Sequence, residues 1–284
     1  MIKFIKHFVL VVLLLLPPFC VFGSISNIRI SNIGSGQFSV SWTSDVEESG
    51  YVRYGKQSDN ATIWSIGNDD RGQEISSTVH HVTIQGLQSN TTYFYEIVSG
   101  ENNYDNANNY YTQKTGPFLE PVLNACQPAG RIFKNLEKTE LAYNTIVYIT
   151  ILGENKQQDN SSSASVIVTH KTSGYWFIDI ANFRTKDLQN SYSIQCGEDL
   201  ILVEAQAGKD GIAKMKTLAV DAGPERPDMV LKQREESYSL TNIIKVLQVL
   251  ANISINVTTE EMDMNKDGVI NMNDVMYGFS CIFY

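Results

Sequence analysis

A twelve-residue segment near the C-terminus, 263–274, carries the residue types and the spacing that bind calcium. Calcium takes roughly six to eight oxygen ligands, and a loop of this length supplies them from positions 1, 3, 5, 7, 9 and 12. The residues at these positions are Asp263, Asn265, Asp267, Val269 through its carbonyl, Asn271 directly or through a water, and Asp274. Gly268 stands at position 6, where the loop turns sharply and needs a positive φ. The alternative is an Asx-rich turn that caps a helix, but the ligands and the glycine in register favour one Ca²⁺.

The segments on either side of this loop predict two amphipathic helices. Apolar residues recur at the i, i+1, i+4, i+7 and i+8 positions of one helix face. They are Ile243, Ile244, Leu247, Leu250 and Ala251 in the first segment and, 32 positions later (275 against 243), Val275, Met276, Phe279, Ile282 and Phe283. We expect the two faces to pack on each other, so that the second helix covers Ile243, Ile244 and Leu247.

The calcium loop and the segment 237–251 together resemble a dockerin, an EF-hand-type module whose loop ends in Asp instead of Glu. A dockerin usually presents two repeats. In the first copy, loop positions 1, 3, 5 and 6 would be Leu231, Gln233, Glu235 and Glu236, so the glycine and the Asp/Asn ligands are lost. The resemblance implies a degenerate dockerin-like module over 232–284 that binds one Ca²⁺ and has a cohesin-like protein as its possible partner.

The elements that precede this module are β-strands. From 24 to 116, short alternating strands are broken by Gly, Asn, Ser and Asp, a pattern typical of a β-sandwich. The segment 38–42 alternates apolar and polar residues, which predicts a strand with one buried face.

Particular residues of this first sandwich resemble known families. Trp42 and Tyr54 on successive strands, with Leu87 six residues before Tyr93, resemble a fibronectin type III domain. In that family the phenol hydroxyl of such a tyrosine closes a corner by bonding to upstream backbone. The run 40–87 also resembles the N-terminal sandwich of purple acid phosphatases, which is itself fibronectin-like and does no chemistry.

A second β-rich segment follows a linker over 117–125, which Pro117 and Pro121 stiffen. Within 126–231, strands are predicted at 145–151, 166–168, 175–178, 200–205 and 215–220. The order of these segments resembles a carboxypeptidase regulatory-like sandwich, a fold that acts as a spacer or an adhesion platform. The fold class is therefore mainly β, with two sandwiches in series before a small α-helical module.

The N-terminal residues 1–23 predict a signal peptide. Lys3 and Lys6 precede an apolar run that ends at Pro17, and Val21–Gly23 offers a cleavage site before Ser24. A transmembrane anchor would need roughly 20 apolar residues, which this run and the rest of the chain do not supply. We expect a protein that is secreted to the extracellular space, the periplasm or the cell surface, with no membrane span.

The net charge bears on the expected partners, and the cysteine content bears on the expected disulfide. The formal net charge is −9, and no basic patch is present to neutralise phosphates, so nucleic acid is not expected as a partner. Three cysteines follow the signal peptide, and Cys126 and Cys196 fall in one predicted domain, so we expect these two to pair and Cys281 to remain free.

Catalytic residues are not expected. His80 and His81 are neighbours on a strand and point to opposite faces, so they cannot share a metal. His170 stands at a strand end, and the metal motifs of a phosphatase, nucleophile elbows and phosphate-binding loops are not found in the sequence. Tyr104, Tyr110 and Tyr111 fit either a sugar-stacking patch or an ordinary loop and strand edge, and the second is favoured.

These features predict a secreted, non-catalytic, calcium-binding scaffold or adhesion protein whose sandwiches carry a docking module. One alternative is an accessory carbohydrate-binding component of an extracellular hydrolase system, with a cell-surface or polysaccharide ligand. A weaker alternative is a fragment related to purple acid phosphatase without its catalytic domain.

Overall fold

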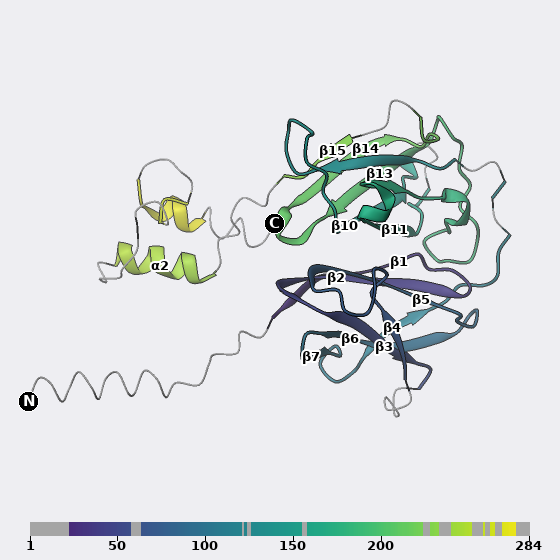
Figure 1. The fold of residues 1–284 in the computed structure, drawn as a ribbon, viewed down its shortest axis with the longest axis horizontal. Helices are drawn as coiled ribbons and strands as arrows, with labels where there is room; N and C mark the ends of the chain where they lie inside the picture. The colour runs from purple at the N-terminus through teal and green to yellow at the C-terminus, as the bar shows by residue number, and fades with distance from the viewer. Residues whose placement is uncertain are drawn as a thin grey trace, which may run out of the picture. The chain divides into compact units, whose positions relative to one another are not determined.

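The computed structural model describes residues 23–276 except 58–63, 121, 124–125, 155–157, 224–227, 233–239, 252–257, 259–261 and 265–268. The chain divides into two compact units: Met1–Gly208 with Ala213–Leu231, and Lys209–Ile212 with Lys232–Tyr284. The first unit holds both β-sandwiches, drawn from purple to green in Figure 1. The mainly β fold class predicted from the sequence is confirmed.

The first sandwich is built from eight strands in two sheets. One sheet has the order β1-β2-β5, and the other has the order β4-β3-β6-β7 with β8 paired to β6. The strands are β1 (Ile25–Ser31), β2 (Gln37–Glu48), β3 (Gly50–Gly55), β4 (Ser65–Asn68), β5 (Ser77–Gln85), β6 (Thr92–Ser99), β7 (Asn102–Tyr104) and β8 (Tyr111–Lys114).

The core of this sandwich contains the residues that carried the fibronectin resemblance. Trp42 is fully buried and its indole nitrogen donates to Ser99 Oγ at 3.0 Å. The Tyr93 hydroxyl accepts a hydrogen bond from the Gln88 backbone nitrogen at 2.9 Å. The tyrosine corner predicted from the spacing of Leu87 and Tyr93 is therefore confirmed.

The second sandwich has the sheets β11-β10-β13-β14 and β12-β9-β15. Its strands are β9 (Ala129–Phe133), β10 (Thr145–Ile151), β11 (Ser163–Val168), β12 (Tyr175–Phe177), β13 (Leu200–Gln206), β14 (Ile212–Leu218) and β15 (Asp228–Val230). Short 3₁₀ helices are η3 (His170–Thr172), η4 (Ile180–Asn182) and η5 (Gly208–Asp210). A disulfide joins Cys126 to Cys196 with a Cα–Cα distance of 5.8 Å, which confirms the predicted pairing. Cys281 lies outside the described residues.

Strand β2 differs from the sequence prediction of one buried face. Ser39 and Ser41 alternate with the core residues, yet both are fully buried. Ser41 Oγ lies 2.7 Å from the Tyr148 hydroxyl on β10 of the second sandwich. The polar face of β2 is therefore covered by a second domain, and hydroxyl pairs replace the water that an exposed face would contact.

The C-terminal unit has a small apolar core of its own around α2 (Leu240–Leu250). Ile243 and Val246 on the helix are buried with Met262, Met264 and Val275, and Val249 and Ile270 pack against this cluster. Ile270 stands at position 8 of the predicted calcium loop.

The buried face of α2 corrects the sequence prediction. Ile243 is buried as expected, but Ile244 and Leu247 are 45% and 39% exposed, and Met276 is 65% exposed. The apolar residues of α2 cover a wider arc than the part of the helix that is buried. Val246 and Val249 lie at one side of this arc, and the core of the unit packs on that side. Phe279, Ile282 and Phe283 lie outside the described residues.

Candidate functional site

The six residues predicted to bind calcium are only partly described. Asp263, Val269, Asn271 and Asp274 are described, whereas Asn265 and Asp267 lie outside the described residues. Among the residues that are described, no group of three His, Cys, Asp or Glu side chains is placed to hold a metal. The predicted ligand set therefore remains a prediction.

Asn271 and Asp274 fix the described end of the loop by hydrogen bonds. The Asp274 carboxylate is fully buried at the start of a helical turn, and its Oδ2 accepts a hydrogen bond from the Asn271 backbone nitrogen at 2.8 Å. Donors of this kind offset the cost of burying a carboxylate. Asn271 Oδ1 accepts from the Asn273 nitrogen at 2.7 Å, and the two bonds together form a capping box at the start of the turn, the arrangement of an Asx-rich turn that caps a helix.

The first repeat is placed differently from the second. Leu231, which would begin the degenerate loop, is 4% exposed and belongs to the core of the second sandwich. Its backbone nitrogen donates to the Phe133 carbonyl at 2.8 Å. This residue is therefore used for packing, in agreement with a first copy that has lost its ligands.

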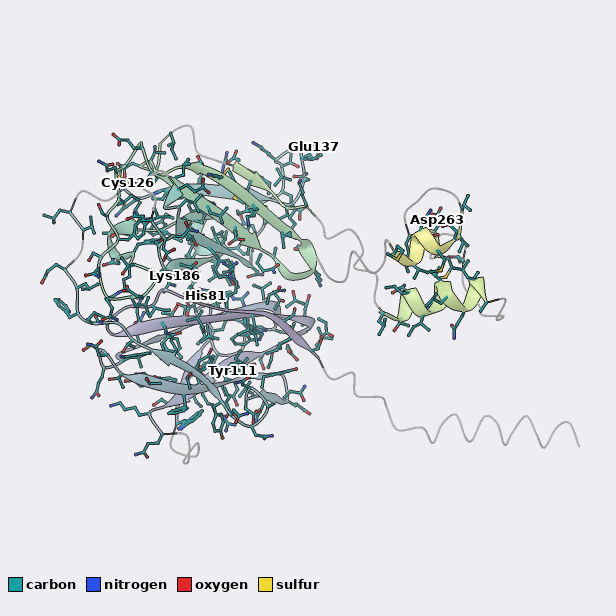
Figure 2. All side chains as sticks on the ribbon, turned by 180° about the vertical axis from the view of Figure 1, so that it is seen from behind. His81, Tyr111, Cys126, Glu137, Lys186 and Asp263 are labelled. Atoms are coloured by element: carbon teal, nitrogen blue, oxygen red, sulfur yellow. A yellow bond between two sulfur atoms is a disulfide. The ribbon has the colours of Figure 1, made fainter. Side chains whose placement is uncertain are left out.

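A chain of hydrogen bonds passes through His81 and joins the two sandwiches. Figure 2 shows His81 at the place where the two sandwiches meet. His81 Nδ1 lies 2.8 Å from Asp70 Oδ2, and His81 Nε2 lies 2.6 Å from Ser165 Oγ on β11. The connectivity is that of a serine nucleophile with its base and orienting carboxylate. Ser165, however, is 7% exposed, and its Oγ also lies 2.6 Å from Ser31 Oγ. This second contact favours a structural role in which the hydroxyl holds β11 against β1.

Its neighbour His80 points to the opposite face, as the strand period predicts. The His80 ring stacks on Trp42 with 4.9 Å between centroids, inside the core of the first sandwich. His80 Nδ1 lies 3.4 Å from Asp69 Oδ2. The third histidine, His170, is exposed and stacks on Tyr143 at 3.7 Å. Each of the three is thus occupied by packing or hydrogen bonding within the fold.

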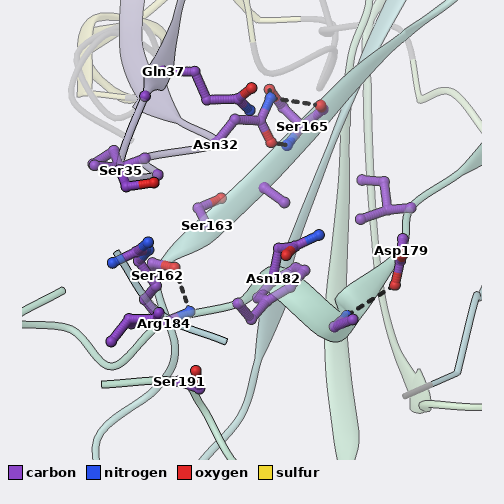
Figure 3. Close-up of a pocket in the computed structure, with 18 of the residues that line it drawn as sticks. Asn32, Ser35, Gln37, Ser162, Ser163, Ser165, Asp179, Asn182, Arg184 and Ser191 are labelled. Atoms are coloured by element: carbon purple, nitrogen blue, oxygen red, sulfur yellow. Dashed lines mark hydrogen bonds between the residues drawn. The ribbon is translucent and has the colours of Figure 1, made fainter. Parts of the chain in front are cut away.

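A cleft of about 880 Å³ lies between the two sandwiches, beside the segment that connects them (Figure 3). Its lining comes from the β1–β2 turn, the residues 118–120, the start of β11 and the segment 177–184. The volume lies within the range of small-molecule sites. This cleft could not be predicted from the sequence, because its residues are dispersed over the chain and only the packing of two domains brings them together.

The tyrosines considered for sugar stacking are used inside the first sandwich. Tyr111 stacks on Tyr95 at 5.3 Å, and Tyr110 packs on Trp64 at 4.7 Å. The Tyr104 hydroxyl donates to the Gly23 carbonyl at 2.6 Å. The favoured interpretation, ordinary loop and strand-edge residues, agrees with these contacts. Exposed aromatic rings occur instead at the cleft, where Phe118 and Phe177 are 73% and 59% exposed.

A known protein family matches the first sandwich. Residues 25–115 match the family described as Purple acid Phosphatase, N-terminal domain. No curated protein matches the chain. Among the helices that the structure describes, none is long and apolar enough to cross a membrane.

Solved structures similar to this chain include two β-sandwich proteins. The sensor domain of the anti-sigma factor RsgI4 in Pseudobacteroides cellulosolvens is 17% identical to this chain, with a TM-score of 0.26. The match covers 34% of this chain and 76% of the sensor-domain chain. The FN1–FN3 domains of chicken CNTN1 are 11% identical, cover 70% of this chain and 66% of their own, and have a TM-score of 0.25. At these scores the likeness carries no information about ligands.

Proposed function

We propose that this chain is an exported, non-catalytic scaffold or adhesion protein whose C-terminal module binds one Ca²⁺ and docks onto a partner protein. The ligand spacing of 263–274 supports the ion. The similarity of residues 25–115 to a non-catalytic phosphatase domain supports a carrier role for the first sandwich.

The observation that carries the docking proposal is the exposed apolar face of α2. Leu240, Ile244 and Leu247 follow the i, i+4, i+7 spacing of one helix face and are 58%, 45% and 39% exposed. The same helix already buries Ile243 and Val246 in the core of its own unit. An amphipathic helix with apolar residues on a second side is suited to a hydrophobic groove in a partner, which the dockerin resemblance assigns to a cohesin-like protein.

Docking is tested by binding of the full chain to an immobilised cohesin domain in calcium and in a chelator. We expect binding in calcium only, since the ion orders the loop that packs beside α2. Leu247→Ser should weaken binding at least tenfold, because it removes apolar contact area from the docking face. Leu136→Ser is the matched control, since Leu136 is 82% exposed in the second sandwich. Calcium-independent binding, or equal loss in both variants, would contradict the proposal.

The non-catalytic part of the proposal has its own test at Ser165. If the Ser165–His81–Asp70 chain only joins the sandwiches, wild-type protein and Ser165→Ala should hydrolyse p-nitrophenyl acetate at the same background rate. A rate that depends on Ser165 would show that the hydroxyl is a nucleophile.

A further inference from the structure

The cleft between the sandwiches contains a buried cation. Arg184 lines the cleft and is 6% exposed. Its Nη1 donates to the Leu188 carbonyl at 3.1 Å, and among the described residues its guanidinium has no other hydrogen bond and no ion pair. A guanidinium offers five N–H donors in a planar fork, so most of them are available to a ligand.

Burial of this charge has an energetic consequence. Loss of hydration disfavours the charged form and lowers the pKa of Arg184 below its ordinary value. The guanidinium has little contact with water and no ion pair to another described residue, so an opposite charge placed beside it would stabilise the charged form. A ligand carboxylate in the cleft would supply that charge and would pair with the fork through two parallel hydrogen bonds.

The guanidinium lies against the segment that leads out of the first sandwich. Gly116, which precedes the linker, leaves the space that Arg184 Nη1 occupies, because a Cβ at this position would collide with that nitrogen. The Gly116 nitrogen donates to the Gly34 carbonyl at 2.9 Å, which anchors the segment to the first sandwich. The guanidinium thus lies where elements of both sandwiches meet.

The remainder of the cleft is suited to a ligand rich in hydroxyl groups. Phe118 and Phe177 expose flat apolar rings there. Gln37, Gln85 and Asn182 line it with amide groups that make no side-chain hydrogen bond to other described residues. Exposed rings with a few neutral donors and acceptors can stack on a sugar ring and bond its hydroxyls.

The charges of the cleft select among anions. Glu120 and Asp179 also line it, so a single guanidinium stands beside two carboxylates. The two carboxylates would repel a polymer with a phosphate on every unit. A sugar with one carboxylate and several hydroxyls can place its single charge at Arg184 and its hydroxyls elsewhere in the cleft.

We propose that this cleft binds an acidic oligosaccharide, with the carboxylate of a uronic acid paired to Arg184 and sugar rings stacked on Phe118 and Phe177. The site uses none of the residues of the C-terminal module, so it stands independently of calcium binding and docking.

The test is titration calorimetry of the full chain with aldotetraouronic acid, which has one glucuronic acid joined to three neutral xylose units, and with its methyl ester, which has nearly the same shape without the charge. Wild-type protein should bind the acid at least tenfold more tightly than the ester, since only the acid can form a charge-assisted pair with Arg184. Arg184→Met should abolish the difference between the two ligands. Phe177→Ala should weaken both, and Leu136→Ala, an exposed apolar position outside the cleft, should weaken neither.

Two further results keep the proposal open to refutation if Arg184→Met does not fold. Arg184→Lys retains the charge but not the fork, and it should lower the affinity for the acid severalfold. Phe177→Ala changes an exposed ring and should leave the fold intact. Equal affinity for acid and ester, or no binding of the acid at millimolar concentration, would overturn the proposal.

Discussion

At the scale of single residues, Asp69 shows how a buried charge is stabilised in the first sandwich. Asp69 is 4% exposed, and its two carboxylate oxygens each accept a hydrogen bond from Arg71 at 2.8 Å. Burial alone would raise the pKa of Asp69, but the hydrogen bonds from Arg71 and the contact with His80 outweigh burial and hold the pKa well below its ordinary range.

This depressed pKa predicts acid sensitivity. Asp69 contributes stability that is present above its unfolded pKa of about 4 and is lost as the pH falls through its folded pKa. Asp69→Asn should lower the free energy of unfolding at pH 7 by about 3–5 kcal/mol, because it leaves Arg71 buried without a counter-charge. The variant should also lose stability less steeply than wild type below pH 4. Urea unfolding at several pH values measures both, and equal acid slopes would contradict the assignment.

Ser24 carries a prediction about processing. Its backbone nitrogen donates to Asp45 Oδ1 at 2.7 Å and its Oγ donates to Asp45 Oδ2 at 3.0 Å. Cleavage before Ser24 would turn that nitrogen into an ammonium group beside a carboxylate. Exported protein should therefore begin at Ser24 on N-terminal sequencing, and Asp45→Asn should lower the Tm of this form more than that of the chain from Met1. Membrane-bound protein with an intact Met1 would refute the prediction.

At the scale of elements, β2 shows why one strand pattern fits two environments. Alternating Ser and apolar residues are expected on a strand with a solvated face, yet a second domain covers that face here. Hydroxyl groups bond equally well to water and to a neighbouring domain, so the pattern alone does not distinguish the two. The face of α2 has the same ambiguity, because periodicity shows that an arc is apolar but not which part of it meets the core.

The hydroxyl pair across the sandwiches can be measured directly. Tyr148→Phe removes the contact between the Tyr148 hydroxyl and Ser41 Oγ, both in buried residues. It should lower the free energy of unfolding by about 1–3 kcal/mol, because a buried hydroxyl loses its partner. Combining it with Ser41→Ala should cost less than the sum of the single changes. If the effects of the two changes are strictly additive, the hydroxyl pair contributes no interaction energy between the two sandwiches.

At the scale of the whole molecule, local patterns predicted more than long-range ones. The two β-rich regions, the tyrosine corner of Tyr93 and the Cys126–Cys196 disulfide follow from spacing and compartment, and the structure confirms them. The cleft does not follow, because Arg184 and Phe177 are ordinary loop and strand residues until a second domain packs beside them. The burial of Arg184 depends on contacts far apart in the sequence, which no motif encodes.

The central claim is that the C-terminal module binds one calcium ion through 263–274. If the predicted ligand set is right, it brings together three carboxylates, Asp263, Asp267 and Asp274, that would repel one another without a cation, so calcium should order the loop and the helical turn after it.

Calorimetry of the full chain with CaCl₂ tests this claim most directly. We expect one ion per chain with a dissociation constant of roughly 10⁻⁶ to 10⁻³ M, since one Asp replaces the bidentate Glu of sensor loops. Asp263→Ala should abolish binding, and Glu235→Ala, in the degenerate copy, should leave it unchanged. Two ions per chain would show that the first repeat still binds calcium, and no binding at millimolar calcium would show that the segment is only a turn.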